Sequence, residues 1–589
     1  MATTKNGEVV DLLQTIGDLM ELRGDESFRV RAYREAARQL DQVTEDIEAL
    51  SREGRLTDIK GVGPSIARTV QEFLETGDAA QRQRLSQEVP ESLIELLGLR
   101  HFGPQRIVRV HRALGVTTLD ELEAAARDGR LLTVSGFGAR SVETLLQAIA
   151  TFREQRKRIP RYLAESVAAG AVHGLRQMAG LGAGEVVVTG EMRRWCETVE
   201  EIELLAQAED PQAVVDAFQR LSLFREVVES GPQGALALTR ERYPVRLHVV
   251  APGEWGPALQ RTTGSAAHNT QLEERAAAAP PPGEASAGGP ADAPASTGAP
   301  GAPEESDDAE AAVYARLGLP LIPPELREGR GEIAAALTGR LPRLIRLADV
   351  RGDLHMHTTW SDGKHSVEEM AREALRLGRE YIAIADHSQS LGVARGLTLE
   401  RLEEQRREIA AVDAALPGIR LLSSVELDIL SDGSLDYPDE VLARFDFVTA
   451  SLHSGFGQPG ERLTQRVLTA MGSRHVDAIG HLTGRILGRR DPLELDVEAI
   501  LRRAAETGTA LEINAWPNRL DLNEEHARRA KELGVRLVIN TDSHSADQLA
   551  YLHSGVEVAR RAWLEPQDVL NTLPLERLLA YLEGRPNKG

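Results

Sequence analysis

The last 240 residues of the chain alternate between short apolar runs and longer amphipathic segments. Seven apolar runs have the length of a strand, for example 381–386 and 535–541. The segments between them, such as 367–378 and 497–508, place apolar residues at helical spacing and end at glycine. A strand and a helix that alternate in this way predict a parallel α/β barrel, here a (βα)7-like barrel over 341–589.

The first 160 residues predict helices that are joined by three glycine-containing turns, at 59–67, 99–107 and 134–142. Glycine between two helices lets backbone N–H groups point outward and hold an anion at a helix N-terminus. The pattern resembles helix-hairpin-helix elements, which grip the DNA backbone without reading its sequence. The alternative is a tight turn with no ligand. The candidate DNA-binding residues are Gly61, Gly63, Gly103, Gly136 and Gly138.

Residues 276–308 are rich in Ala, Pro, Gly and Ser and show no periodicity. A segment of this composition cannot bury enough apolar surface to offset the entropy lost on ordering. We therefore expect a disordered linker at 276–308, between the helical and strand-rich parts before it and the barrel after it.

Cysteine content, hydropathy and charge exclude several classes of protein, such as disulfide-rich and membrane-spanning proteins. A single cysteine, Cys196, excludes a disulfide framework within the chain, and no apolar run reaches the ~18 residues of a membrane span. The N-terminus lacks a signal-peptide core, so we expect a cytoplasmic, nucleoid-associated protein without a membrane partner. The net charge of −21 argues against indiscriminate binding to nucleic acid. Residues 101–160 nevertheless hold ten Lys and Arg against six Asp and Glu, which allows a local basic face.

Histidines and carboxylates follow the predicted strands of the last 240 residues. His355 and His357 are two positions apart, so a strand would place both imidazoles on one face, where they can share a metal. A mixed imidazole and carboxylate set suits Zn²⁺, Mn²⁺ or Fe²⁺ rather than Ca²⁺. The run at 510–514 has no obvious ligand. The candidate metal ligands are His355, His357, Asp362, His387, Glu426, His453, His481, Asp542 and His544.

The motifs HMHTTWSDG, SSVELDIL, GHLTGR and NTDSH resemble the PHP (polymerase and histidinol phosphatase) phosphoesterase domain. The resemblance implies two to three divalent ions, Zn or Mn and possibly Fe, with His355, His357 and Glu426 at the catalytic centre. Closely spaced divalent ions activate water and stabilise charge on a leaving oxygen, so phosphoester hydrolysis is the expected reaction. By resemblance, the three metal sets are His355, His357, Glu426 and Asp542; Glu426, His453 and His481; and Asp362, His387 and His544, with Glu426 as the bridge.

Motifs along nearly the whole chain resemble bacterial family X DNA polymerases (PolX). They are FRVRAYREAA, the glycine turns, VVVTGEMRRWCETVEEIELL, TGSAAHN and LGLPLIPPELREGRGE, in this order. The resemblance implies a multidomain protein with helical helix-hairpin-helix domains, an α+β palm and thumb, and the PHP barrel. The expected domains are 1–85 (N-terminal, DNA-binding), 86–160 (helical fingers), 161–250 (palm), 251–340 (thumb-like, with the linker) and 341–589 (PHP).

The palm departs from the family pattern at its metal site. Glu201 and Glu203 stand where the family has an Asp-x-Asp pair, and Arg246 stands where it has a third Asp. Mg²⁺ tolerates little deviation from octahedral geometry, and Arg246 puts a permanent cation at the cation site, so Mg²⁺ or Mn²⁺ binding in the palm is doubtful. The nucleotide site also departs, at Glu191 and at Arg261-Thr262. An alternative is a metal-free cluster in which Arg246 pairs with both glutamates.

These observations predict a DNA-repair protein with an inactive polymerase site and a PHP domain that acts as a metal-dependent 3′–5′ exonuclease or related DNA phosphoesterase. Its expected partner is gapped, nicked or 3′-ended duplex DNA, and no sequence feature indicates a protein partner. Two alternatives stay open. The first is a working Mn²⁺- or Mg²⁺-dependent gap-filling polymerase, and the second is a small-molecule phosphatase of the histidinol-phosphate type.

Overall fold

The computed structural model describes residues 5–41, 47–59, 61–99, 102–182, 184–278 and 304–585. Residues 1–157 belong to one compact unit, and the rest of the chain, apart from two short segments, forms a second. Each unit is described by itself. Among the described residues, no helix is both long and apolar enough to cross a membrane.

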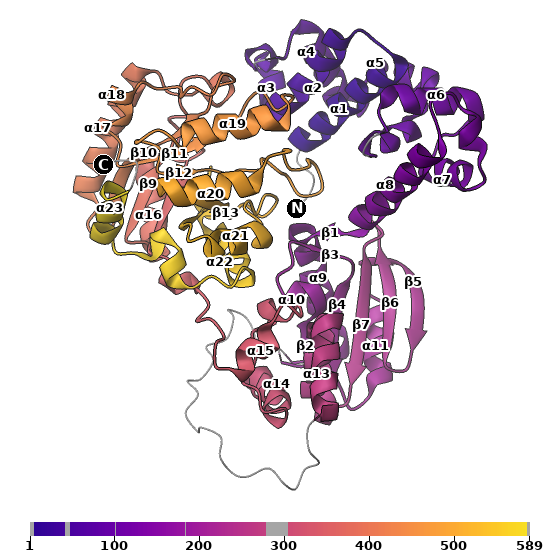
Figure 1. Cartoon of the computed structure of the whole chain (residues 1–589). Coiled ribbons are helices and arrows are strands. Elements are labelled where there is room, and N and C mark those ends of the chain that lie inside the picture. Colours follow the sequence, from indigo (N-terminus) through magenta and orange to yellow (C-terminus); the bar gives the residue numbers. More distant parts are fainter. Residues whose placement is uncertain are drawn as a thin grey trace. The chain divides into compact units, whose positions relative to one another are not determined.

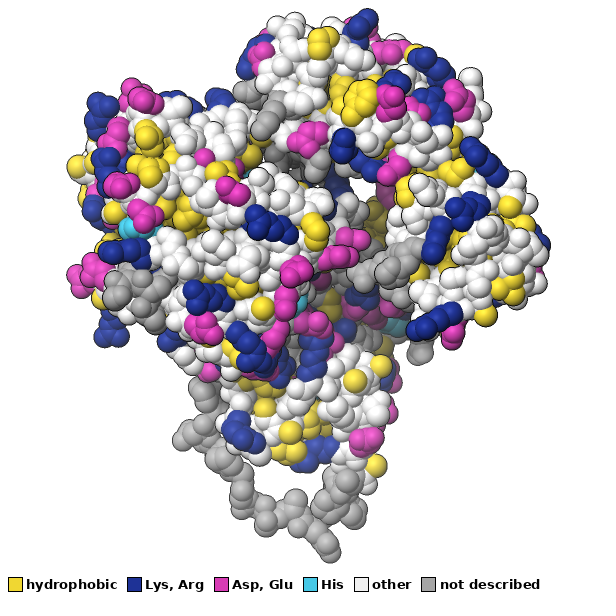
Figure 2. All heavy atoms as spheres, turned by 45° about the horizontal axis from the view of Figure 1, so that its top comes forward, with side chains coloured by type: hydrophobic (Ala, Val, Ile, Leu, Met, Phe, Trp, Pro, Cys, Tyr) yellow, Lys and Arg dark blue, Asp and Glu magenta, His cyan; other side chains and the backbone are white. Residues whose placement is uncertain are grey.

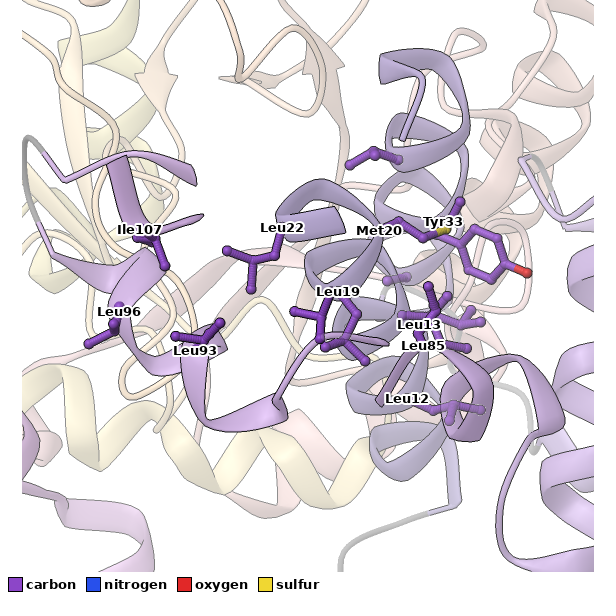
Figure 3. Packing of buried hydrophobic residues seen from close by; sticks show 14 of the residues in the cluster. Leu12, Leu13, Leu19, Met20, Leu22, Tyr33, Leu85, Leu93, Leu96 and Ile107 are labelled. Carbon is purple, nitrogen blue, oxygen red and sulfur yellow. The ribbon is translucent and has the colours of Figure 1, made fainter. Parts of the chain in front are cut away.

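The first unit is helical and is organised around helix α1 (Lys5–Arg23). Leu13, Leu19 and Met20 of α1 are fully buried. Figure 3 shows the leucines of α1 among Tyr33, Leu85, Leu93 and Ile107, which come from four later segments. One apolar core thus runs through this unit. Its other α-helices are α2 (Ser27–Asp41), α3 (Ile47–Arg52), α4 (Pro64–Thr76), α5 (Ala80–Glu88), α6 (Pro104–Leu114), α7 (Leu119–Arg127) and α8 (Ala139–Lys157).

A mixed five-stranded sheet opens the second unit, with strand order β2-β4-β7-β6-β5. Strands β4 and β7 pair in parallel and the other pairs are antiparallel. Helices α9 (Arg161–Ala179) and α11 (Pro211–Gln219) share a buried apolar cluster with one face of this sheet. The strands are β2 (Val186–Val188), β4 (Ile202–Gln207), β5 (Phe224–Gly231), β6 (Gly234–Thr239) and β7 (Pro244–Val250).

The predicted linker is shorter than 276–308, because helix α13 continues to Ala278 and helix α14 begins at Glu304. The remainder, 279–303, lies outside the described residues. A buried ion cluster holds α14 in place: the carboxylate of Glu310 pairs with Arg327 and, at 2.9 Å, with Arg193. The helices around it are α12 (Trp255–Thr263), α13 (Ala266–Ala278), α14 (Glu304–Arg316) and α15 (Glu332–Leu337).

The C-terminal part is the predicted parallel barrel, with the seven strands in sequence order from β8 to β14 and helices outside them (Figure 1). The barrel is nearly closed: the amide of Asp542 donates to the carbonyl of His355 at 2.9 Å, and that of His357 donates to Ser543 at 2.8 Å. The predicted fold class is confirmed. The strands are β8 (Gly352–Met356), β9 (Tyr381–Ile384), β10 (Arg420–Asp428), β11 (Phe447–Ser451), β12 (Ala478–Ile479), β13 (Ala510–Asn514) and β14 (Leu537–Asn540).

Local sequence explains where the barrel helices begin and end. Helix α16 (Val367–Arg376) starts at a capping box, in which Ser366 and Glu369 satisfy each other's backbone N–H groups. Helix α20 (Val497–Thr507) ends at Gly508, whose φ of 69° is left-handed and costs glycine little. The other main α-helices are α17 (Leu399–Ala415), α19 (Gly460–Ala470), α21 (Glu524–Glu532), α22 (Leu552–Arg561) and α23 (Leu575–Glu583).

Candidate metal centre

His355 and His357 converge on the same two carboxylates, as the two-residue spacing predicts. The Nε2 atom of His355 lies 3.4 Å from Glu426 Oε2 and 3.7 Å from Asp542 Oδ1. The Nε2 atom of His357 lies 3.5 Å and 3.1 Å from the same two oxygens. Both histidines are fully buried. Strand β8 therefore directs both imidazoles toward oxygens supplied by β10 and by the end of β14.

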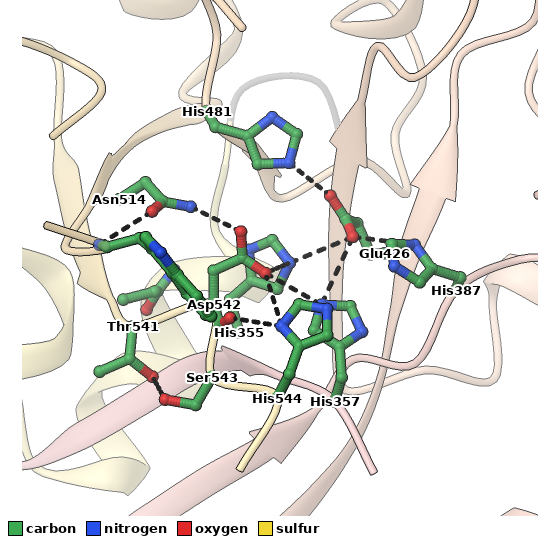
Figure 4. Close-up of polar contacts among 12 residues, drawn as sticks. His355, His357, His387, Glu426, His481, Asn514, Thr541, Asp542, Ser543 and His544 are labelled. Atoms are coloured by element: carbon green, nitrogen blue, oxygen red, sulfur yellow. Dashed lines mark hydrogen bonds and ion pairs between the residues drawn. The ribbon is translucent and has the colours of Figure 1, made fainter. Parts of the chain in front are cut away.

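Glu426 is the centre of the cluster. Its Oε1 lies 2.8 Å from His481 and 3.1 Å from His453, and its Oε2 lies 3.0 Å from His387. Together with His355 and His357, five imidazoles surround this one buried carboxylate, and Figure 4 shows His387 and His481 pointing at it. Glu426 therefore has the position of a bridging ligand.

Eight of the nine predicted ligands, all except His481, fall into three groups whose donor atoms lie within 4.8 Å of one another. The group His355, His357, Glu426 and Asp542 has the same members as one of the three expected sets. The other two groups differ from expectation: His387 takes the place of His481 in one, and His357 joins the other. They are His387, Glu426 and His453, without His481; and His357, Asp362, His387 and His544, with His357 added.

Two of the candidate ligands have backbone conformations that L-residues rarely adopt. The φ angles are +22° at His481 and +54° at Asp542. Such conformations cost on the order of 1–3 kcal/mol and persist only where the surroundings hold them. Here the amide of His481 donates to Glu512 Oε2 at 2.7 Å, and the amide of Asp542 donates to the carbonyl of His355. Backbone strain and candidate ligands thus coincide at the ends of β12 and β14.

The sequence analysis missed two carboxylates that orient candidate histidine ligands. Glu512, in the strand that had no obvious ligand, contacts His355 Nδ1 at 2.7 Å. Asp428, two residues after Glu426 in β10, contacts His453 Nδ1 at 2.5 Å. A carboxylate on Nδ1 fixes the ring and leaves Nε2 available as a ligand. The available signal was a Glu or Asp inside an otherwise apolar strand.

The cluster suits a divalent cation. His355 Nε2 is buried and finds no hydrogen-bond partner in the described structure, although it points toward two carboxylates. Burial disfavours the charged form of Glu426, but the charges of His453, His355 and His387 outweigh burial and hold its pKa well below the usual range. Burial lowers the pKa of His453, yet Glu426 and Asp428 raise it to about 9. Glu426 therefore stays ionised, as a metal ligand must, and a cation bound here would displace protons from the imidazoles around it.

The glycine turns begin three helices of the first unit. Gly63 and Gly103 are the N-caps of α4 and α6, and Gly138 precedes α8. A Cβ added at any of these three glycines would meet no atom within 4 Å, so their surroundings are open. Gly61 and Gly136 instead have positive φ, of 85° and 90°, which the turns require.

The second and third turns lie together. The rings of Phe102 and Phe137 meet edge to face with centroids 6.1 Å apart. A cavity of about 360 Å³ opens beside them, and Arg106 and Arg140 line it with Ser141. On the face drawn in Figure 2, Lys and Arg side chains are interspersed with Asp and Glu.

The palm cluster differs from the metal-free cluster considered above. Arg246 pairs with Glu201 at 2.8 Å and with Glu229 at 3.3 Å, rather than with both glutamates of the E-x-E pair. Glu203 instead lies 3.7 Å from His248. The alternative is wrong about the second partner, because Glu229, on β5, reaches Arg246 from the other side.

Glu191, at the nucleotide-site position, is also engaged. Its Oε1 pairs with Arg158 at 2.6 Å, and its Oε2 accepts from the amide of Glu200 at 2.7 Å.

The hydrogen bond with Glu201 raises the pKa of Arg246 above its usual value, so that guanidinium stays charged. Glu191 and Arg246, two departures from the family pattern, are thus both held in ion pairs.

Comparison with known families matches three parts of the chain. Residues 4–79 match the helix-hairpin-helix domain, residues 93–151 match the SAM-like helix-hairpin-helix tandem, and residues 353–515 match the PHP domain. Probable phosphatases of Thermoanaerobacter sp. (strain X514) and Acetivibrio thermocellus are 30% and 31% identical to about 40% of this chain, over 96% of their own length.

A similarity that spans the whole chain decides the family. The DNA polymerase/3′-5′ exonuclease PolX of Bacillus subtilis is 37% identical over 582 residues, which cover 98% of this chain and 99% of that protein. The same comparison includes the helical unit, the mixed sheet and the barrel. The chain belongs to the PolX family of bacterial family X DNA polymerases with a C-terminal PHP domain.

Proposed function

We propose that this chain is a DNA-repair enzyme whose PHP barrel removes nucleotides from DNA 3′ ends by metal-dependent hydrolysis of phosphodiesters. The observation that carries the proposal is Glu426, one buried carboxylate that is shared by five imidazoles. The name of the Bacillus subtilis relative, which includes a 3′-5′ exonuclease, supports the direction of degradation.

Two to three divalent ions, Zn²⁺ or Mn²⁺ and possibly Fe²⁺, fit the donor set. His355, His357, Glu426 and Asp542 would hold one; His387, Glu426 and His453, with His481 beside them, a second; and His357, Asp362, His387 and His544 a third. When bound, such ions activate water and stabilise charge on the leaving oxygen. Glu512 and Asp428 hold the rings of His355 and His453 in place. The burial of His355 and His357 restricts approach to the C-terminal end of the barrel strands.

The helical unit would bind the substrate, which we propose is gapped, nicked or 3′-ended duplex DNA. The open N-termini of α4, α6 and α8 can donate backbone hydrogen bonds to phosphates. We assign 1–85 and 86–160 to DNA binding, 161–250 to the palm, 251–340 to a thumb-like segment and 341–589 to hydrolysis.

We further propose that the palm does not polymerise. Arg246 fills the position of a metal-binding carboxylate and is itself held by Glu201 and Glu229. The names of the relatives support two alternative functions, DNA polymerisation and hydrolysis of small phosphate esters. The Bacillus subtilis protein is named a polymerase as well as an exonuclease, and the shorter relatives are named probable phosphatases.

One experiment separates these functions. The purified full chain is incubated with Mn²⁺ and a 5′-labelled duplex that carries a recessed 3′ end or a one-nucleotide gap, with and without dNTPs. A parallel reaction contains histidinol phosphate. The proposal expects stepwise shortening of the DNA and no extension. Extension of the primer, or hydrolysis of the phosphomonoester without attack on DNA, would contradict it.

A further inference from the structure

The end of strand β13 supplies no candidate metal ligand, but it carries a closed loop, 515–522. The loop is tied at its base by two backbone hydrogen bonds. The amide of Asn514 donates to Asp521 at 2.6 Å, and that of Leu522 donates to Glu512 at 2.9 Å. The loop therefore starts and ends on the strand that holds Glu512, whose carboxylate orients His355.

The middle of this loop is anchored from outside as well. Buried Arg485 donates from Nε to the carbonyl of Arg519 at 2.9 Å and from Nη2 to the carbonyl of Leu520. The amide of Leu487 donates to Asn518 at 2.7 Å. Such anchoring places the backbone of Arg519 at a fixed position relative to the barrel.

The loop borders the candidate metal centre on two sides. Its Trp516 meets His544 edge to face, with ring centroids 5.7 Å apart. Its Arg519 places Nε 3.9 Å from Asp542 Oδ2, whereas Oδ1 of the same carboxylate faces His357. Arg519 thus stands on the outer side of a candidate ligand.

The guanidinium of Arg519 is not used elsewhere. Within the described part of the chain it donates no hydrogen bond, and its one ion pair, with Asp542, is at the long distance of 3.9 Å. Its side chain is 23% exposed. The guanidinium of Arg485, by contrast, is already engaged: it donates two hydrogen bonds to Glu197, at 2.9 and 2.5 Å, besides its two backbone contacts.

We propose that Arg519 binds a non-bridging oxygen of the phosphodiester during hydrolysis. A guanidinium has five donors in a planar fork that matches phosphate, and it stays charged at any physiological pH. Its neighbour Asp542 holds Arg519 near the site without occupying its donors at hydrogen-bond distance. The proposal rests on the proposed hydrolytic function and adds a substrate-binding residue to it.

The test uses the full chain and a 5′-labelled duplex with a recessed 3′ end. The variants are Arg519→Gln, which removes the charge, and Arg519→Lys, which keeps a charge but loses the fork. Arg528→Gln is the matched control. Arg528, on the outer helix α21, is similarly exposed, at 31%, and its guanidinium packs on the ring of Trp563. Initial rates, metal content and thermal unfolding are measured for each protein.

Loss of one charge-assisted bond to phosphate should lower kcat/KM by roughly 10- to 100-fold in Arg519→Gln. Arg519→Lys should keep part of the activity, added guanidine should restore part of the loss in Arg519→Gln, and Arg528→Gln should match the wild type. The metal content of all variants should be unchanged. A rate for both Arg519 variants within twofold of the wild type, or a loss that follows loss of metal, would overturn this role for Arg519. A wild-type chain that leaves DNA intact would instead refute the proposed function itself.

Discussion

Glu512 contacts Nδ1 of His355 at 2.7 Å although 157 positions separate the two residues. The same carboxylate oxygen accepts from Asn540 at 3.0 Å, and the other oxygen accepts from the amide of His481. Strand β13 thereby fixes groups on β8, on β14 and after β12. A residue with no direct place in the ligand set therefore determines how that set is arranged.

Replacing Glu512 with Gln should weaken metal binding by about 10- to 100-fold, because His355 and the backbone of His481 lose their orienting charge. Titration of the metal-free protein with Zn²⁺ or Mn²⁺ against a chelator measures the effect. Glu506→Gln, at a surface glutamate on α20 whose side chain is 66% exposed, is the control. Equal affinities for the two variants would show that Glu512 has no orienting role.

The double variant His355→Ala with His357→Ala should lose bound metal and all hydrolysis of DNA, since both imidazoles face Glu426 and Asp542. Far-UV circular dichroism should still report a folded chain. His475→Ala, outside the cluster, serves as the control. Retained nuclease activity in the double variant would remove the basis for the metal assignment.

DNA binding can be tested at glycines where a side chain fits the fold. Gly63 and Gly103 have negative φ, of −77° and −67°, which any L-residue can adopt, and open space at the Cβ position. Valine should therefore leave the fold intact. It should nevertheless obstruct the approach of a phosphate and lower affinity for gapped duplex by roughly tenfold, the value of one charge-assisted bond.

Binding measured by anisotropy should also weaken steeply with salt and depend little on sequence. Gly253→Val, at another open glycine, outside the helical unit, is the control. Affinity that ignores salt, or that falls equally in the control, would argue against phosphate contacts at the helix N-termini.

The palm should not fill a one-nucleotide gap at a useful rate. Loss of a two-metal clamp removes several kcal/mol of transition-state stabilisation, roughly a thousandfold in rate. The comparison is between a chain with only His355→Ala and His357→Ala and one that also has Glu201→Ala and Glu203→Ala. Because the hydrolytic site is inactive in both, degradation cannot mask synthesis. Extension that is robust in the first and absent in the second would mean that these glutamates bind metal.

The stability of the second unit should depend on the ionisation of Glu557. Burial, and then repulsion by Glu325, raise the pKa of Glu557 from 4.5 to about 8. A carboxyl whose folded pKa is raised stabilises the fold fully below its unfolded pKa, and this stability is lost as pH rises toward the folded pKa. Urea unfolding midpoints should therefore fall between pH 5 and pH 8, and Glu557→Gln should reduce that fall. A variant with the wild-type pH dependence would show that Glu557 is not responsible.

The sequence predicted the barrel and its cluster well because both depend on local patterns. Most candidate ligands lie at the end of an apolar run, and the ends of parallel strands meet at one edge, so His355 and Asp542 could be placed together without coordinates. Glu512 and Asp428 were missed because they are single carboxylates inside strands. Their partners lie far away in sequence, and no local spacing reveals them.

In the palm, by contrast, the sequence did not predict all of the side-chain contacts. The register of β4 and β7 places Glu203 beside Arg246. The side chain of Arg246 nevertheless turns to Glu201 and Glu229. The strand that carries Glu229 is paired to β6 with irregular register, and such a register is not encoded in a short window of sequence.

The backbone bond between Asp542 and His355 closes the barrel and also joins two candidate metal ligands. The first of them emerges from the ribosome almost two hundred residues before the second. A nascent or truncated chain without the end of β14 would lack both the closure and the ligands Asp542 and His544. The proposed nuclease activity would then arise only after the helical unit, to which we assign DNA binding, has been synthesised.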